Sequence, residues 1–263
     1  MTAITLFIIG LCAGSFALAF TSRLFARQSW ALDRSRCDHC KKTLEPIDLI
    51  PLLSWLSTSG RCRYCRAPLS KRYPLVELLT GLAWLGSYYW WPYGFTRMGW
   101  LMLALWLVML TLLVSLVLFD LTWQLLPDKV VYTLIGIATF SKLFQIIYFG
   151  AWERLPGIAL GVAVGSGLFW LLYHYSKGRY IGGGDVKYGI FYGVLLGSGF
   201  KSLLVISIGS LLGTLVLLPA LLTRRTKLSS TIPFGPFLII ATAIVYLFGD
   251  KLVDLLTSNY LFP

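Results

Sequence analysis

Long apolar runs separated by short polar junctions follow one another along the whole chain. Most of these runs approach the roughly 20 residues that a helix needs to cross the hydrocarbon of a bilayer. They predict an all-α polytopic membrane protein with about eight transmembrane helices, and a count of seven stays open. The predicted spans are Ile4–Phe20, Pro74–Trp91, Gly99–Phe119, Val130–Phe149, Leu155–Tyr175, Val186–Gly197, Leu203–Leu222 and Ile232–Phe248.

Composition supports the membrane assignment. Of the 263 residues, 57% are hydrophobic and only 13% are charged, which is more apolar side chain than a soluble core of this size could bury. The span Val186–Gly197 is the weakest, because it is short and flanked by glycines. It is expected to be a half-helix, to tilt, or to be shielded by neighbouring helices.

The basic residues gather in every second junction between the apolar runs, as expected when alternate junctions lie on the same side of a membrane. The net charge is +12, and 18 of the 23 Lys and Arg residues lie in alternate junctions, namely 21–73, 120–129, 176–187 and 223–228. The positive-inside rule places these junctions in the cytoplasm and both chain termini outside. The cations form no single stripe with interleaved aromatics, so we expect the bilayer to be a partner and nucleic acid not to be one.

The long junction 21–73 carries two CxxC motifs that are 21 residues apart. This spacing is typical of a four-cysteine, closed and therefore structural zinc site, and zinc would supply folding energy to a loop too small for its own core. The predicted ligands are Cys37, Cys40, Cys62 and Cys65.

Other interpretations of the cysteines remain open. Two disulfides do not suit a cytoplasmic loop, and a redox CxxC motif does not explain why there are two of them. His39 could replace one ligand of the first motif, and Cys12, inside the first span, is expected to be a packing residue.

Two aspartates, Asp120 and Asp185, lie where an apolar run meets a polar junction. A charged side chain near the bilayer centre costs about 2.5 kcal/mol or more, so such acids indicate function. Asp128 differs, because it can cap the following helix. Lys187 could pair with Asp185, which is the structural alternative for that residue.

Three glycines, Gly182, Gly183 and Gly184, precede Asp185 and allow a tight turn and close approach to a substrate or helix. The string has neither the spacing nor the ending of a nucleotide-binding loop. Two neighbouring carboxylates at a water-accessible boundary would share one proton, as in aspartic proteases. The pair is therefore predicted to activate a water and polarise a scissile carbonyl.

Glu77 is a third acid, about one turn inside its predicted span. Its structural role would be to pair with Arg72 or another loop cation. Its functional role would be to hold a cationic or polar ligand at the junction between loop and membrane.

At these residues the chain resembles the type IV prepilin peptidases, which are GxGD-type membrane aspartyl proteases. The resemblance covers nearly the whole chain. It rests on the paired CxxC motifs and on several strings in the same order, namely Gly14-Ser15-Phe16, Ile50 to Leu56, Gly60-Arg61-Cys62, Lys71 to Glu77, Asp120 to Asp128, Gly182 to Lys187, and Ile232-Pro233-Phe234-Gly235-Pro236.

The resemblance implies that Asp120 and Asp185 are the catalytic pair, with Gly182 to Gly184 and Lys187 in support. It implies cleavage of a basic leader from prepilins or pseudopilins at the cytoplasmic face of the bacterial inner membrane. It also implies N-methylation with S-adenosylmethionine, with Gly60, Arg61 and Glu77 as the candidate methyl-donor residues. The expected domains are a first helix (1–20), a zinc-binding loop (21–73) and a protease domain (74–263).

Two rivals come from other classes. A proton- or cation-coupled transporter could use intramembrane acids and regulate itself through the zinc loop. A non-catalytic scaffold could assemble secretion machinery through the same loop. The transporter should tolerate Asp→Asn at one position with altered coupling, and the scaffold should tolerate it at both.

Overall fold

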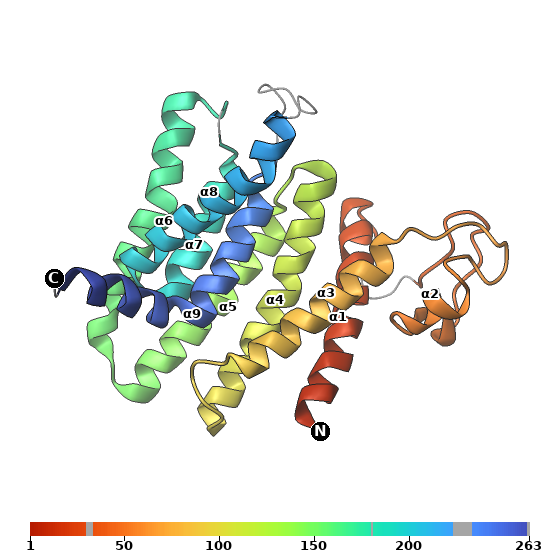
Figure 1. Cartoon of the computed structure of the whole chain (residues 1–263), viewed down its shortest axis with the longest axis horizontal. Coiled ribbons are helices and arrows are strands. Elements are labelled where there is room, and N and C mark those ends of the chain that lie inside the picture. Colours follow the sequence, from red (N-terminus) through yellow and green to blue (C-terminus); the bar gives the residue numbers. More distant parts are fainter. Residues whose placement is uncertain (30–33, 180, 223–232, 262–263) are drawn as a thin grey trace. The chain divides into compact units, whose positions relative to one another are not determined.

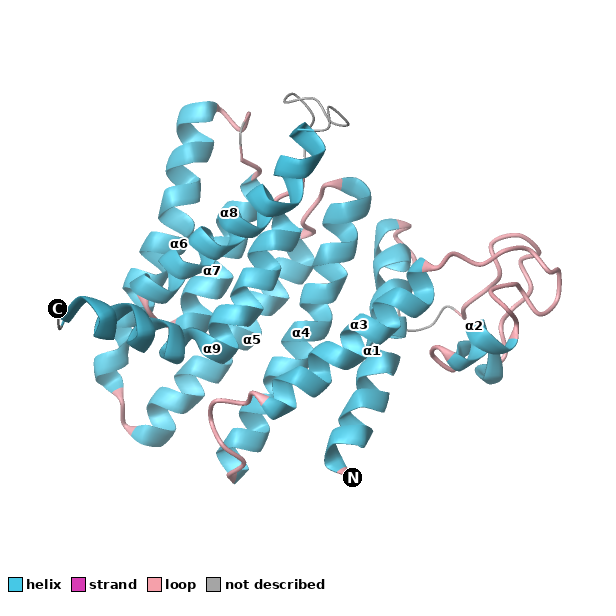
Figure 2. Cartoon of the chain, viewed as in Figure 1, coloured by secondary structure: helices cyan, strands magenta, loops and turns pink. Residues whose placement is uncertain are grey.

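The computed structural model describes residues 1–29, 34–179, 181–222 and 233–261. Within these ranges the secondary structure is helical apart from two isolated β-bridges, which confirms the all-α expectation (Figures 1 and 2). The helices are α1 (Thr2–Phe25), η1 (Pro46–Leu49), α2 (Leu53–Ser57), α3 (Arg72–Tyr89), α4 (Arg97–Trp123), α5 (Asp128–Phe149), η2 (Trp152–Arg154), α6 (Leu155–Ser176), α7 (Gly183–Leu196), α8 (Gly199–Leu222) and α9 (Gly235–Leu261).

The eight predicted apolar segments correspond to α1 and α3 to α9. Six of these helices, α1, α4, α5, α6, α8 and α9, are long and apolar enough to cross a membrane within the described ranges. Helix α3 carries Arg72 and Glu77, and α7 has only 14 residues, so these two fall outside that group. The predicted cytoplasmic junction 223–228 and residue Ile232 lie outside the described residues.

The chain divides into two compact units, which we describe separately. The first comprises Met1–Trp91 and Phe95–Leu118, and the second comprises Pro92–Gly94 and Phe119–Pro263. In the first unit α1 packs closely against α3. A Cβ atom on Gly14 would lie 2.8 Å from the Cα atom of Glu77, so only glycine permits this approach. Helix α1 therefore covers the start of α3, where Glu77 lies.

In the second unit α6 and α7 meet through glycines. A Cβ atom on Gly161 would lie 2.5 Å from the carbonyl oxygen of Gly193, and one on Gly189 would lie 2.5 Å from that of Gly165. Such small-residue contacts let two backbones touch, which is how helices associate in the absence of a hydrophobic driving force. The backbone of α7 is thus fixed against α6.

Side chains of α7 complete its burial. Tyr188 donates to Thr242 of α9 at 3.0 Å, and Tyr192 donates to the carbonyl oxygen of Gly165 at 2.9 Å. Both tyrosines and Phe191 are fully buried. Helix α7 is therefore shielded by its neighbours, as expected for the weakest span, and its first turn has a defined position.

Candidate active site and metal centre

Asp120 lies one turn before the end of α4 and is buried, with 7% of its surface exposed. The backbone N–H of Gly235, at the start of α9, donates a hydrogen bond to its carboxylate. A Cβ atom on Gly235 would lie 2.5 Å from the Oδ2 atom of Asp120. The positive end of α9 therefore contacts this carboxylate directly, and the position requires glycine.

Asp185 lies in the first turn of α7, which is not one of the six membrane-length helices. The backbone N–H of Gly182 donates to its carboxylate. Gly184 packs on Leu126, where an added Cβ atom would lie 2.9 Å from the Leu126 Cβ atom. The glycine string thus brings the start of α7 against the connection between α4 and α5, six residues after Asp120.

The two carboxylates interact. Burial, together with the negative charge of Asp120, raises the pKa of Asp185 to about 6, despite the hydrogen bond from Gly182. Neither aspartate forms an ion pair within the described ranges. Two neighbouring acids without a cation favour a state in which they hold one proton between them.

Lys187 pairs with Asp128 and not with Asp185. Its Nζ atom lies 2.7 Å from Oδ1 and 2.8 Å from Oδ2 of Asp128. The alternative in which Lys187 neutralises Asp185 is therefore wrong. The expected helix cap is also wrong, because Asp128 is the first residue of α5, Pro127 occupies the cap, and no side chain caps this helix.

Gly235 and Leu126 are site residues to which sequence reasoning gave no role. Leu126 supports Gly184, and Gly235 supports Asp120. The sequence string around Gly235 is one of the motifs of the family resemblance. Its neighbour Phe234 packs edge-on against the buried Phe169, with 6.2 Å between the ring centroids. A glycine followed by proline at a helix start was the available signal.

The four predicted cysteine ligands form one cluster in the first unit. Their sulfur atoms all lie within 4.8 Å of one another, and those of Cys37 and Cys65 are 3.8 Å apart. A tetrahedral zinc ion with Zn–S bonds of about 2.3 Å requires sulfurs about 3.8 Å apart, so the donor set fits zinc. All five cysteines of the chain are free thiols, so the disulfide alternative is wrong. His39 is not part of the cluster.

The two CxxC turns repeat the same backbone pattern. Cys37 N–H donates to the carbonyl of Lys42 at 3.0 Å, and Cys62 N–H donates to that of Ala67 at 2.8 Å. Lys41 and Arg66 adopt φ angles of 58° and 59° at equivalent positions. Each turn thus presents two sulfurs to the same point.

Glu77 is buried and accepts a hydrogen bond at 2.8 Å from the backbone N–H of Leu52. The proposed pairing with Arg72 is absent from the ion pairs of the described residues. Gly60 and Arg61 lie beside the second CxxC turn. Gly60 has a φ of 69° and packs on Trp55, whose ring would meet an added Cβ atom at 2.8 Å.

The first unit also contains an apolar cavity of about 560 Å³. Its walls include Leu52 and Trp55, the residues that contact Glu77 and Gly60 respectively. Glu77 and Gly60 therefore each contact a residue of one cavity wall without lining the cavity themselves.

Two protein-family models match different parts of the chain. Residues 8–91 match the bacterial peptidase A24 N-terminal domain, and residues 106–218 match the type IV leader peptidase family. No solved structure matches significantly.

Several characterised relatives align over most of the chain. A prepilin leader peptidase/N-methyltransferase of Aeromonas hydrophila is 36% identical over 87% of this chain and 76% of its own length. The enzyme of that name from Pseudomonas aeruginosa is 34% identical over 90% and 77%. A type 4 prepilin-like protein leader peptide-processing enzyme of Escherichia coli is 34% identical over 83% and 77%. The chain is thus a multi-pass membrane protein that belongs to the type IV leader peptidase family.

Proposed function

We propose that this chain is a prepilin leader peptidase/N-methyltransferase that processes type IV prepilins, and that Asp120 and Asp185 are its peptidase dyad. The observation that carries the proposal is the electrostatic repulsion between these two buried acids, with no cation paired to either one in the described ranges. Family membership favours this function over the transporter and scaffold alternatives.

The peptidase step follows from one shared proton. The ionised carboxylate takes a proton from a water, whose oxygen attacks the scissile carbonyl carbon while the neutral carboxylic acid donates a hydrogen bond to the carbonyl oxygen. When the tetrahedral intermediate collapses, the C–N bond breaks and the leaving amine takes a proton from the dyad. The hydrogen bonds from Gly235 and Gly182 support this cycle by orienting the two carboxylates.

Lys187 acts as a supporting residue in this proposal, through Asp128. Their ion pair joins the first residue of α5 to the first turns of α7. Gly182, Gly183 and Gly184 supply the turn that brings Asp185 to the α4–α5 connection. These residues position the dyad and take no part in proton transfer.

The second activity is assigned to the first unit. S-adenosylmethionine would supply a methyl group to the new amino terminus, and Gly60, Arg61 and Glu77 would lie at its site. The buried Glu77 carboxylate and the neighbouring cavity support this placement, because sites for small molecules are concave and mostly apolar with a few polar groups. Zinc, held by the four cysteines, would cross-link the two CxxC turns.

The substrates are type IV prepilins or pseudopilins, and the site of action is the bacterial inner membrane. We place the dyad on the cytoplasmic side and both termini outside, which rests on the distribution of Lys and Arg. The functional domains proposed are those with the predicted boundaries of 1–20, 21–73 and 74–263, which differ from the boundaries of the two compact units.

Cleavage of a prepilin by the purified chain in lipid nanodiscs tests the dyad. Asp120→Asn and Asp185→Asn should each abolish cleavage, and Asp128→Asn is the matched control in the same junction, because it removes an acid that is already paired. Cleavage that persists in either dyad variant would contradict the aspartyl mechanism. Mass spectrometry of the product's amino terminus, with and without S-adenosylmethionine, reports methyl transfer separately.

A further inference from the structure

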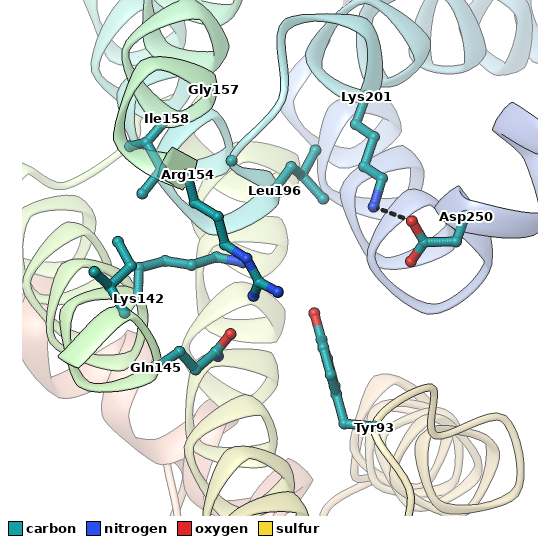
Figure 3. A pocket seen from close by; sticks show the side chains of 11 residues that line it. Tyr93, Lys142, Gln145, Arg154, Gly157, Ile158, Leu196, Lys201 and Asp250 are labelled. Atoms are coloured by element: carbon teal, nitrogen blue, oxygen red, sulfur yellow. Dashed lines mark hydrogen bonds and ion pairs between the residues drawn. The ribbon is translucent and has the colours of Figure 1, made fainter. Parts of the chain in front are cut away.

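The second unit contains a cavity of about 350 Å³ at the carboxyl end of α7 (Figure 3). Asp185 lies in the first turn of the same helix. Leu196 and Gly197, at the carboxyl end of α7, form part of its wall. Fourteen helical residues separate the two ends by about 20 Å at a rise of 1.5 Å per residue. The cavity is therefore distinct from the dyad.

Positive charge is concentrated in this cavity. Lys142 of α5, Arg154 before α6 and Lys201 of α8 all line it, and Figure 3 shows their side chains converging. The carboxylate of Asp250 is paired with Lys201 at 2.6 Å. Within the described ranges no ion pair involves Lys142 or Arg154, so the cavity carries two uncompensated cations.

A purely structural role explains only part of this arrangement. Lys142 can stabilise the carboxyl end of α7, because its Nζ atom lies 4.0 Å from where a Cβ atom of Gly197 would be. That role gives no reason for Arg154 to face the same space. Lys142 is half-buried and Arg154 is exposed at the rim of the cavity, so the two like charges repel one another, and an anion between them reduces this repulsion.

The chemistry of the wall favours phosphate. An arginine and a lysine are the side chains that bind phosphate oxygens, the first through paired N–H donors and the second as a point charge. The first turn of α6, through Gly157, adds the positive end of a 22-residue helix. The buried amide side chain of Gln145 lines the same cavity.

The surroundings allow two sources of such an anion. Tyr148 and Trp152, which lie between Lys142 and Arg154 in the chain, are 65% and 57% exposed. Exposed aromatics near helix ends are typical of the membrane–water interface, where lipid headgroups and soluble anions both have access. We propose that this cavity binds a phosphate-bearing anion, held by Lys142 and Arg154 on the membrane face opposite the dyad.

Native mass spectrometry of the full chain in detergent tests binding of a lipid headgroup. The probe is dioleoylphosphatidylglycerol, with the zwitterionic dioleoylphosphatidylcholine for comparison. Lys142→Gln and Arg154→Gln should each weaken phosphatidylglycerol binding about tenfold or more, as expected for the loss of a charge-assisted hydrogen bond. Lys251→Gln is the control, because it removes a cation beside Asp250 that does not line the cavity.

Inorganic phosphate tests a soluble source. The wild type should broaden the phosphorus NMR signal of phosphate, and the same two variants should broaden it less. This result, without a preference for phosphatidylglycerol over phosphatidylcholine, would support a site for soluble phosphate. Lys142→Arg keeps the charge and should keep binding in either case, which separates loss of the site from misfolding. Binding of neither probe, equal weakening by Lys251→Gln, or equal losses in Lys142→Arg and Lys142→Gln would each overturn the proposal.

Discussion

The Nζ atom of Lys187 contacts both carboxylate oxygens of Asp128, at 2.7 and 2.8 Å, although 59 positions separate the two residues. Asp185 is only two positions from Lys187, yet it receives no such contact. Residues two apart on a helix point to different sides, which explains the choice of partner. The consequence is that the cation nearest in sequence is drawn away from the dyad, and the two catalytic candidates keep their mutual repulsion.

Removing the Lys187–Asp128 pair should have a small effect. Both side chains are partly exposed, and pairs of this kind contribute about 0–1 kcal/mol. We expect Asp128→Asn to slow cleavage by less than about tenfold. Asp120→Asn and Asp185→Asn should slow it by at least about a hundredfold, since each removes an acid–base group. Initial cleavage rates in one lipid composition provide the comparison, and a loss in Asp128→Asn as deep as in Asp185→Asn would contradict it.

Gly235→Ala should inactivate the peptidase without unfolding the chain. The added methyl would lie 2.5 Å from the Oδ2 atom of Asp120, so the carboxylate or the start of α9 must shift. A misplacement of about 1 Å can cost about a hundredfold in rate. Gly136→Ala in α5 is the control, because nothing lies within 4 Å of its added methyl. Equal cleavage rates for both variants would show that Gly235 does not position Asp120.

How far the sequence predicts this fold depends on whether its signals are local. The apolar runs are continuous and the cysteine spacing is regular, so the helices and the sulfur cluster could be anticipated. Gly235 and Asp120 are more than 100 positions apart, and no periodic pattern in the sequence indicates that they meet. The partners of Lys187 and Glu77, which are the Asp128 carboxylate and the backbone N–H of Leu52, were also missed, because proximity in sequence says little about which groups meet across the fold.

The contact between α6 and α7 should be intolerant of a single methyl. In Gly193→Ala the new Cβ atom would lie 2.6 Å from the carbonyl oxygen of Gly161, and backbone atoms cannot move aside as a flexible side chain can. We expect a destabilisation of about 1–3 kcal/mol, typical of overpacking. Gly167→Ala in α6, the other helix of this pair, has open space around its methyl and should be neutral or slightly stabilising. Thermal unfolding in detergent distinguishes the two, and a similar midpoint for both would refute the close packing.

Binding of zinc should require the four clustered cysteine side chains. We expect about one zinc ion per wild-type chain, since the four sulfurs suit one tetrahedral ion. Cys62→Ser should lose most of it, and limited proteolysis should then cut the 34–71 region faster. Cys12→Ser is the matched control, because Cys12 lies in α1 outside the cluster. Full zinc content in Cys62→Ser would rule out the four-thiolate site.

Glu77 should hold the loop in a strained conformation at Leu52. Leu52 has a φ of 60° and a ψ of −51°, and Leu53 N–H donates to the carbonyl of Pro51 at 2.6 Å, which together form a γ-turn that is rare for such a residue. Strain of this kind costs about 1–3 kcal/mol and persists only where surrounding contacts enforce it. The hydrogen bond from Leu52 to the buried carboxylate of Glu77 is such a contact.

Glu77→Ala should therefore release the segment 46–57, whereas Glu77→Gln keeps an oxygen acceptor and should release it less. Hydrogen–deuterium exchange of peptides from this segment measures the difference, and peptides from α6 serve as an internal reference. Leu52→Gly removes the strain and should partly restore protection when combined with Glu77→Ala. Because the proposed methyl-donor site adjoins the same segment, methyl transfer should fall more than cleavage in Glu77→Ala. Unchanged exchange in that variant would mean that other contacts fix Leu52.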